Sequence, residues 1–140
     1  VLWDIQSVIT SGEPIFLTGD FNEPSHLDWT KEATQAGLHP LKVAFPTSIQ
    51  VTEAGLKDAF RQIYPDPVAV PGFTWPAGTY PETPDSSVTD PADRIDFVYF
   101  TGKKVKVKNV QRIGEASETS DISFPKYPSD HRAVLVTFDL

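Results

Sequence analysis

Apolar residues recur at helical spacing in three segments of the chain, and these segments are the expected helices. The first covers residues 2–9, the second 28–37 and the third 52–64. Asp28 is of a residue type that caps helix N-termini, and Pro65 cannot continue the third helix. The pattern therefore predicts three helices, each with one apolar face.

Four other segments have the composition of strands. A short apolar run at 15–19 is followed much later by runs at 94–100, 103–113 and 131–140. The run at 103–113 alternates Lys with Val, which is typical of a solvated edge strand protected by its lysines. Together with the helices, these runs predict an α/β domain with a mixed, mainly antiparallel sheet and helices on one face.

The segment 65–92 shows no periodicity and is rich in Pro, Thr and Asp. A loop of this length within a compact domain is usually functional or disordered. Its aromatic residues, Phe73, Trp75 and Tyr80, argue against simple disorder, because disordered segments are poor in aromatics. We therefore expect a functional loop.

The composition narrows the chemistry. The 140 residues contain no Cys, which excludes thiolate catalysis, zinc–thiolate sites and disulfides. The net charge of −7 gives no strong surface for nucleic acid, and no apolar run approaches the roughly 20 residues of a membrane span. The chain has no Met and opens within a helical pattern, so we expect further residues upstream, and the cellular compartment stays undetermined.

Polar residues gather at the ends of three expected strands. They are Asp20 and Asn22; Asp93, Arg94 and Asp96; and Ser129, Asp130 and His131. The run Ser-Asp-His is not a catalytic triad, because neighbouring strand residues point to opposite faces. Zinc is a weak alternative, since the chain has only three His and no HExxH spacing.

Hard oxygen ligands near a single His suit the hydrolysis of a phosphate ester assisted by Mg²⁺ or a similar cation. In such a reaction Asp20 would orient and deprotonate a water, and the amide of Asn22 would donate to a phosphoryl oxygen. His131 would donate a second hydrogen bond, and Asp130 would bind the metal directly or through water.

The stretches "LTGDFNEP", "DRIDFVYF" and "PSDHRAVLVTF" resemble the three C-terminal signatures of the endonuclease/exonuclease/phosphatase superfamily. The resemblance implies a four-layered α/β sandwich of two similar halves, with the active site across both. Residues 1–140 would be the C-terminal half. The inner face of its sheet would then pack against the N-terminal half or a second copy.

By this resemblance, Asp20 and Asn22 match the pair that engages the attacking water, the phosphate and the metal. Asp130 matches a metal ligand, and His131 matches the group that contacts the phosphoryl oxygens. Asp96 matches the carboxylate that orients this histidine.

Three further residues receive roles from the resemblance. Asp93 is the reserve candidate for the orienting carboxylate, because some members place it before the Arg. Trp75, and less strongly Phe73, match a substrate-facing loop.

The N-terminal motifs of the family, including its metal-binding Glu, are absent from this chain. The expected function is therefore metal-dependent hydrolysis of phosphate esters, with Mg²⁺ (or Mn²⁺ or Ca²⁺), as part of a larger domain, and the isolated chain is expected to have little or no activity. Two alternatives stay open: a non-catalytic interaction module, and a small enzyme assembled from two copies.

Simpler roles also exist for several residues. Asp96 could form a buried ion pair with Arg94 or Arg132, and His131 could be a core histidine. Trp3 and Trp29 are expected in the core, and His26 on a surface loop.

Overall fold

The strands form two three-stranded sheets within the residues that the computed structural model describes, 2–77 and 92–140. In the first sheet, β3 (Asp96–Thr101) is the central strand. It pairs antiparallel with β1 (Ile15–Asp20) on one side and with β2 (Lys57–Asp58) on the other. The second has β6 (Ala133–Asp139), antiparallel, and β5 (Ile122–Ser123), parallel, on either side of β4 (Lys106–Gly114). The chain is thus an α/β fold with mainly antiparallel sheets, as predicted, and the four-layered sandwich stays a prediction.

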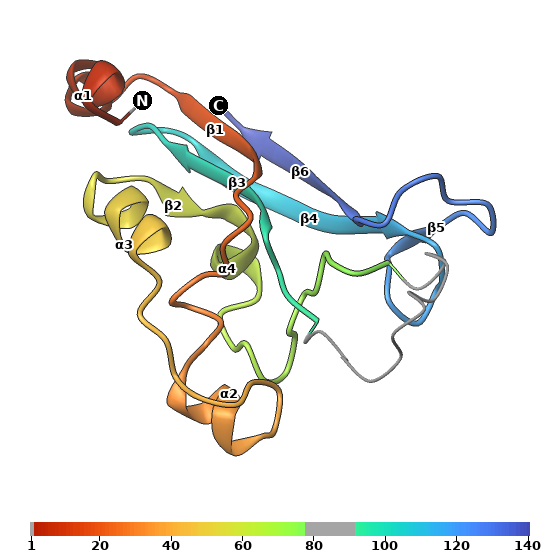
Figure 1. The fold of residues 1–140 in the computed structure, drawn as a ribbon. Coiled ribbons are helices and arrows are strands. Elements are labelled where there is room, and N and C mark those ends of the chain that lie inside the picture. Colours follow the sequence, from red (N-terminus) through yellow and green to blue (C-terminus); the bar gives the residue numbers. More distant parts are fainter. Residues whose placement is uncertain (1, 78–91) are drawn as a thin grey trace.

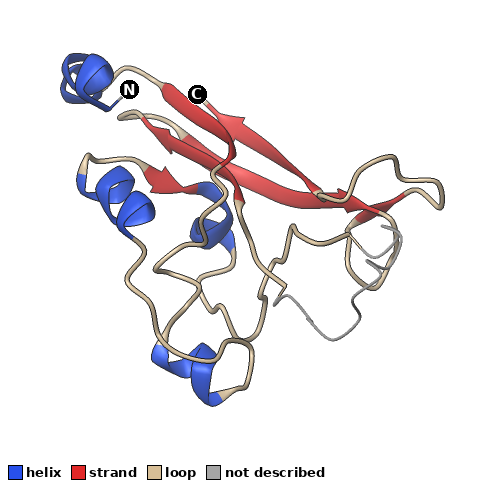
Figure 2. Cartoon of the chain, viewed as in Figure 1, coloured by secondary structure: helices blue, strands red, loops and turns tan. Residues whose placement is uncertain are grey.

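Two of the helices pack beside the first sheet, and another lies apart from it. In Figure 1, α3 and α4 lie along one side of the strands and α1 lies at the start of β1. Figure 2 shows the strands side by side, with α2 well below them. No described helix is long and apolar enough to cross a membrane. The helices are α1 (Leu2–Ser11), α2 (Lys31–Gln35), α3 (Pro46–Glu53) and α4 (Ala59–Ile63).

Strand β3 is the centre of the packing because both of its faces are covered. Phe97 and Tyr99 pack with Val51 and Leu56 on the side of α3. Phe100, on the opposite face, belongs to a second cluster with Ala59 and Val105, against which Val98, Val107, Val136 and Phe138 pack. The period-two alternation of this strand therefore joins the helices on one side to β4 and β6 on the other.

The single helix predicted over 52–64 is wrong, because two helices and a short strand occupy this region. Helix α3 ends at Glu53, and Gly55 has a φ of 102°, a left-handed conformation that suits glycine. Asp58 then starts a new helix by accepting hydrogen bonds from the backbone N–H groups of Phe60 and Arg61. The apolar residues keep helical spacing across this region, although the helix itself is interrupted at Gly55.

Two other predictions of local structure need correction. The helix expected from Asp28 begins instead at Lys31, with Thr30 as its cap, because the Asp28 carboxylate binds two arginines. Trp3 is 94% exposed, so it is not a core residue, whereas Trp29 is buried as predicted.

The lysine-rich strand β4 is formally the central strand of its sheet. However, β5 pairs only with Ile113 and Gly114, so the lysine-bearing half has a strand partner on one side alone. Over that half, the predicted edge character holds.

Candidate functional site

The antiparallel register of β1 and β3 places two carboxylates opposite each other. Asp20 ends β1, Asp96 begins β3, and the two are direct partners in the ladder. Partners in an antiparallel ladder have Cβ atoms about 4.5–5.5 Å apart. Because like charges in this arrangement repel, the pair favours a positive group beside it.

The turn after β1 is held by its own polar residues. Asp20 Oδ1 accepts a hydrogen bond from the backbone N–H of Asn22 at 2.8 Å, and Asn22 has a φ of 49°. Asn tolerates this left-handed conformation better than most residues. Glu23 is used differently, since its Oε1 accepts from the backbone N–H of Thr47 in the first turn of α3. The turn therefore leaves Asp20 and Asn22 at the strand end, while Glu23 connects the turn to the start of α3.

His131 completes the cluster from the segment just before β6. Its Nδ1 lies 2.9 Å from Asp96 Oδ2, and its backbone N–H donates to Ser129 Oγ at 3.1 Å. A carboxylate only accepts hydrogen bonds, so this contact keeps the proton on Nδ1 and leaves Nε2 as the ring nitrogen that Asp96 does not engage. Asp96 thus pairs with His131, not with Arg94 or Arg132.

The pKa of His131 lies above its ordinary value of 6.5. Burial alone would lower this pKa, but the hydrogen bond and charge of Asp96, and the charges of Asp20 and Asp130, outweigh it. The environment therefore favours the imidazolium, which can donate a hydrogen bond from Nε2.

A buried ion network is centred on Arg94, two residues before Asp96 in the chain. Arg94 is 2% exposed and its Nη2 lies 2.6 Å from Asp58 Oδ2 and 2.9 Å from Asp28 Oδ2. Arg61 Nε binds the other oxygen of Asp28 at 2.7 Å. Since Asp28 follows the Asn22 turn and Arg94 precedes β3, the network links the segment after β1 to the start of β3.

A cavity of about 320 Å³ opens beside His131 and is lined by Asn22, Pro24, Trp75, Asp93 and Ile95. Asp93 accepts a hydrogen bond from Trp29 Nε1 at 2.8 Å, and burial raises its pKa. Phe73 does not line this cavity and packs edge-on against His39. Trp75 therefore lines this cavity, whereas Phe73 packs with His39, and the substrate role of either residue stays a prediction.

The residues present fit a hard cation at the end of β1 and β3. Asp20, Asp96 and His131 each offer one ligand atom, and these atoms lie within 4.8 Å of one another. Two carboxylates supply the oxygen donors that Mg²⁺ prefers. Asp130, which the sequence indicated as a ligand, lies outside this group.

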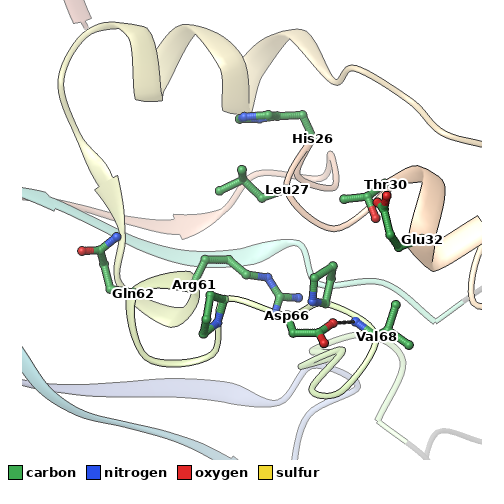
Figure 3. A pocket seen from close by; sticks show the side chains of 10 residues that line it. His26, Leu27, Thr30, Glu32, Arg61, Gln62, Asp66 and Val68 are labelled. Atoms are coloured by element: carbon green, nitrogen blue, oxygen red, sulfur yellow. Dashed lines mark hydrogen bonds between the residues drawn. The ribbon is translucent and has the colours of Figure 1, made fainter.

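A larger cavity of about 610 Å³ lies away from this cluster, between the loop at 26–32 and the end of α4 (Figure 3). The one arginine that reaches it, Arg61, already donates to Asp28 and to the carbonyl oxygens of Tyr64, Val70 and Pro71. His26 is half-buried and its Nδ1 contacts Ser48 Oγ. These side chains are committed to holding the fold, so size alone does not identify the functional cavity.

The structure brings together most of the residues that the sequence indicated. Asp20, Asn22, Asp96, His131 and Trp75 surround one region, and their chemical roles stay predictions. Sequence reasoning did not assign a role to the Arg94 network or to Thr74. Thr74 lies in the "FTW" stretch, in which the sequence predicted roles for Phe73 and Trp75 alone.

The comparisons with known proteins agree with this geometry. The family model of the endonuclease/exonuclease/phosphatase family matches residues 3–131. An uncharacterized protein of Caenorhabditis elegans is 35% identical over 130 residues, which are 89% of this chain and 40% of that protein. No solved structure matches. The chain belongs to the endonuclease/exonuclease/phosphatase family.

Proposed function

We propose that this chain supplies the carboxylate, amide and imidazole groups of a metal-dependent phosphoesterase that uses an activated water. The observation that carries the proposal is the convergence of Asp20, Asp96 and His131 from three different strand ends, within 4.8 Å of one another. Family membership gives the reaction class, hydrolysis of phosphate esters.

In this proposal the side chains divide the steps of hydrolysis among them. Asp20 orients the attacking water and takes its proton, and the amide of Asn22 donates to a phosphoryl oxygen. Nε2 of His131 donates to a second phosphoryl oxygen, while Asp96 fixes the ring through Nδ1. Trp75 contacts the ester group from the side of the cavity.

The proposed cofactor is Mg²⁺, or Mn²⁺ or Ca²⁺, held by Asp20 with help from Asn22. Asp130 lies outside the cluster of Asp20, Asp96 and His131, so it would bind the cation through a water. When bound, such a cation polarises the phosphoryl oxygens and stabilises the charge that develops on them. It would also neutralise the repulsion between Asp20 and Asp96 across the ladder.

We further propose that residues 1–140 form the C-terminal half of the catalytic domain. The chain spans 40% of the length of its C. elegans relative. Phe16 on β1 is 43% exposed although it contacts Phe138, which leaves apolar surface for a second half. A second copy of the chain is the other possible occupant.

The first experiment assays the 140-residue chain and the full-length protein with Mg²⁺ or Mn²⁺ against a bis-aryl phosphodiester and plasmid DNA. We expect turnover by the full-length protein, loss of turnover with a chelator, and little turnover by the chain alone. Robust turnover by the chain alone, abolished by Asp20→Ala, would contradict the half-domain proposal. Sedimentation then shows whether a dimer is the active form.

The second experiment substitutes the site in the full-length protein. His131→Ala and Asp20→Ala should each lower kcat about 10²- to 10⁴-fold. Thr137→Val, at an exposed position of β6, is the matched control and should leave kcat unchanged. Unchanged activity in His131→Ala would refute the phosphoesterase site and favour an interaction module.

A further inference from the structure

The Asp96–His131 pair is assembled by strands that do not pair with each other. Asp96 begins β3 of the first sheet, whereas His131 precedes β6 of the second. No ladder of backbone hydrogen bonds therefore sets the distance between these two side chains. Another part of the chain has to fix their separation.

The segment 73–77 lies between the two strand ends and is hydrogen-bonded to both. On the side of β3, the backbone N–H groups of Thr74 and Trp75 both donate to the carbonyl oxygen of Asp93, each at 2.9 Å. On the side of β6, the Arg132 N–H donates to Thr74 O at 2.7 Å, and the Ala77 N–H donates to the carbonyl oxygen of Asp130. The segment thus bridges the residues that flank Asp96 and His131.

Thr74 makes the central contacts of this bridge. Its side chain is fully buried, and its Oγ1 accepts hydrogen bonds from the backbone N–H groups of Ile95 at 3.1 Å and Asp96 at 3.2 Å. Its carbonyl oxygen meanwhile holds Arg132, the residue next to His131. One residue therefore binds the backbone of Asp96 through its hydroxyl and the neighbour of His131 through its carbonyl.

We propose that Thr74 is a positioning residue, whose buried hydroxyl fixes the backbone of Asp96 so that its carboxylate meets His131 Nδ1. The effect on catalysis rests on the proposed function, but the effect on the pair does not. Valine matches threonine in shape and lacks the hydroxyl, so Thr74→Val removes the acceptor from both N–H groups. Serine keeps the acceptor, and Thr137→Val is the exposed control.

The first test uses NMR on the ¹⁵N-labelled chain with a chelator present. In wild type, we expect a hydrogen-bonded Nδ1–H resonance of His131, assigned by its loss in His131→Gln, and protected amides at Ile95 and Asp96. Thr74→Val should lose the resonance and exchange both amides faster, whereas Thr74→Ser and Thr137→Val should match wild type. A folded Thr74→Val protein that keeps the resonance and the protection overturns the proposal.

If Thr74→Val does not fold, wild type and Thr74→Ser decide the question. Rapid exchange of the Ile95 and Asp96 amides in wild type, or loss of the His131 resonance in Thr74→Ser, overturns the proposal. If the Ile95 and Asp96 amides are protected in wild type and Thr74→Ser keeps the His131 resonance, while Thr74→Val does not fold, the proposal is supported.

The second test measures kinetics in the full-length protein. Misplacing a catalytic group by about 1 Å can cost around 100-fold in rate, so Thr74→Val should lower kcat about 10- to 100-fold with little change in KM. Thr74→Ser should restore kcat. If His131→Ala leaves activity unchanged, the proposed function fails, and the NMR result still judges the role of Thr74. If His131→Ala is inactive but Thr74→Val has wild-type kcat, the positioning role fails alone.

Discussion

Arg94 and Asp96 are two residues apart, yet they belong to clusters with opposite surroundings. Arg94 is buried and lies between Asp28 and Asp58, and its guanidinium nitrogens are 3.1 Å or less from the carboxylate oxygens that they contact. The side chains of Asp96 and His131 are 20% and 26% exposed and face a second carboxylate, Asp20. The charges of the Arg94 network are buried and balance one another, whereas the cluster of Asp20, Asp96 and His131 is partly exposed and has more carboxylates than cationic groups.

The difference shows where this molecule holds its fold and where it leaves room for chemistry. Two arginines oppose two aspartates in the buried network, so each charge removed from water has a partner. In the exposed cluster, one imidazole stands beside the two carboxylates of Asp20 and Asp96, so their negative charge is only partly balanced. Stability and function are therefore expected to respond to different substitutions.

The largest expected effect is on the buried network. Arg94→Met leaves Asp28 and Asp58 buried without their main cation, which should lower the free energy of unfolding by roughly 3–5 kcal/mol. Urea denaturation of the chain measures this change. Lys108→Met, which removes an exposed ion pair with Asp139, is the control and should change stability little. A loss no larger than that of the control would contradict the comparison.

The next effect should fall on activity and spare stability. Asp96→Asn keeps the size of the side chain but removes the charge that holds the His131 proton on Nδ1. In the full-length protein, kcat should fall about 10²- to 10⁴-fold, while the urea midpoint of the chain changes little. A large loss of stability would show that Asp96 belongs with the buried network after all.

A smaller effect should appear in the pH dependence of stability. The pKa of His131 is raised in the folded chain, so the pair stabilises the fold fully below pH 6.5, the ordinary pKa of an unfolded histidine. This contribution, about 1 kcal/mol or less for a partly exposed pair, is lost as the pH rises through the folded pKa. Urea titrations across this range measure it. A pH dependence that is unchanged in Asp96→Asn, in which the pair is broken, would count against it.

The smallest expected effect is a gain. Asp20→Asn removes the repulsion between two carboxylates that are direct ladder partners, but it also removes a charge that attracts the His131 imidazolium. At a pH above the folded pKa of His131, where the ring is neutral, the chain should therefore become more stable by a few tenths of a kcal/mol. The same substitution should greatly reduce turnover by the full-length protein. Thermal unfolding at low salt measures the gain, and added salt should diminish it. Marked destabilisation would show that Asp20 has a structural role.

Local signals predicted the strands better than the helices. The runs at 15–19, 94–100 and 131–140 became β1, β3 and β6, because each is a short apolar segment with clear ends. The helix expected over 52–64 failed because Gly55 adopts a positive φ and Asp58 caps a separate helix. Periodicity reports which residues face the core, but it does not report where the backbone bends.

The sequence by itself determined the residue types of the site and the strand ends that carry them. Asp20, Asn22, Asp96 and His131 are predicted from motifs that resemble the signatures of the family, and their catalytic roles stay proposals. Only the tertiary structure decided that Arg94 is buried in an ion network, that Trp3 is exposed, and that Thr74 joins two strands which do not pair. Those contacts connect residues 20 to 70 positions apart, and no local pattern encodes such pairings. They arise when the chain closes and each buried polar group must find a partner.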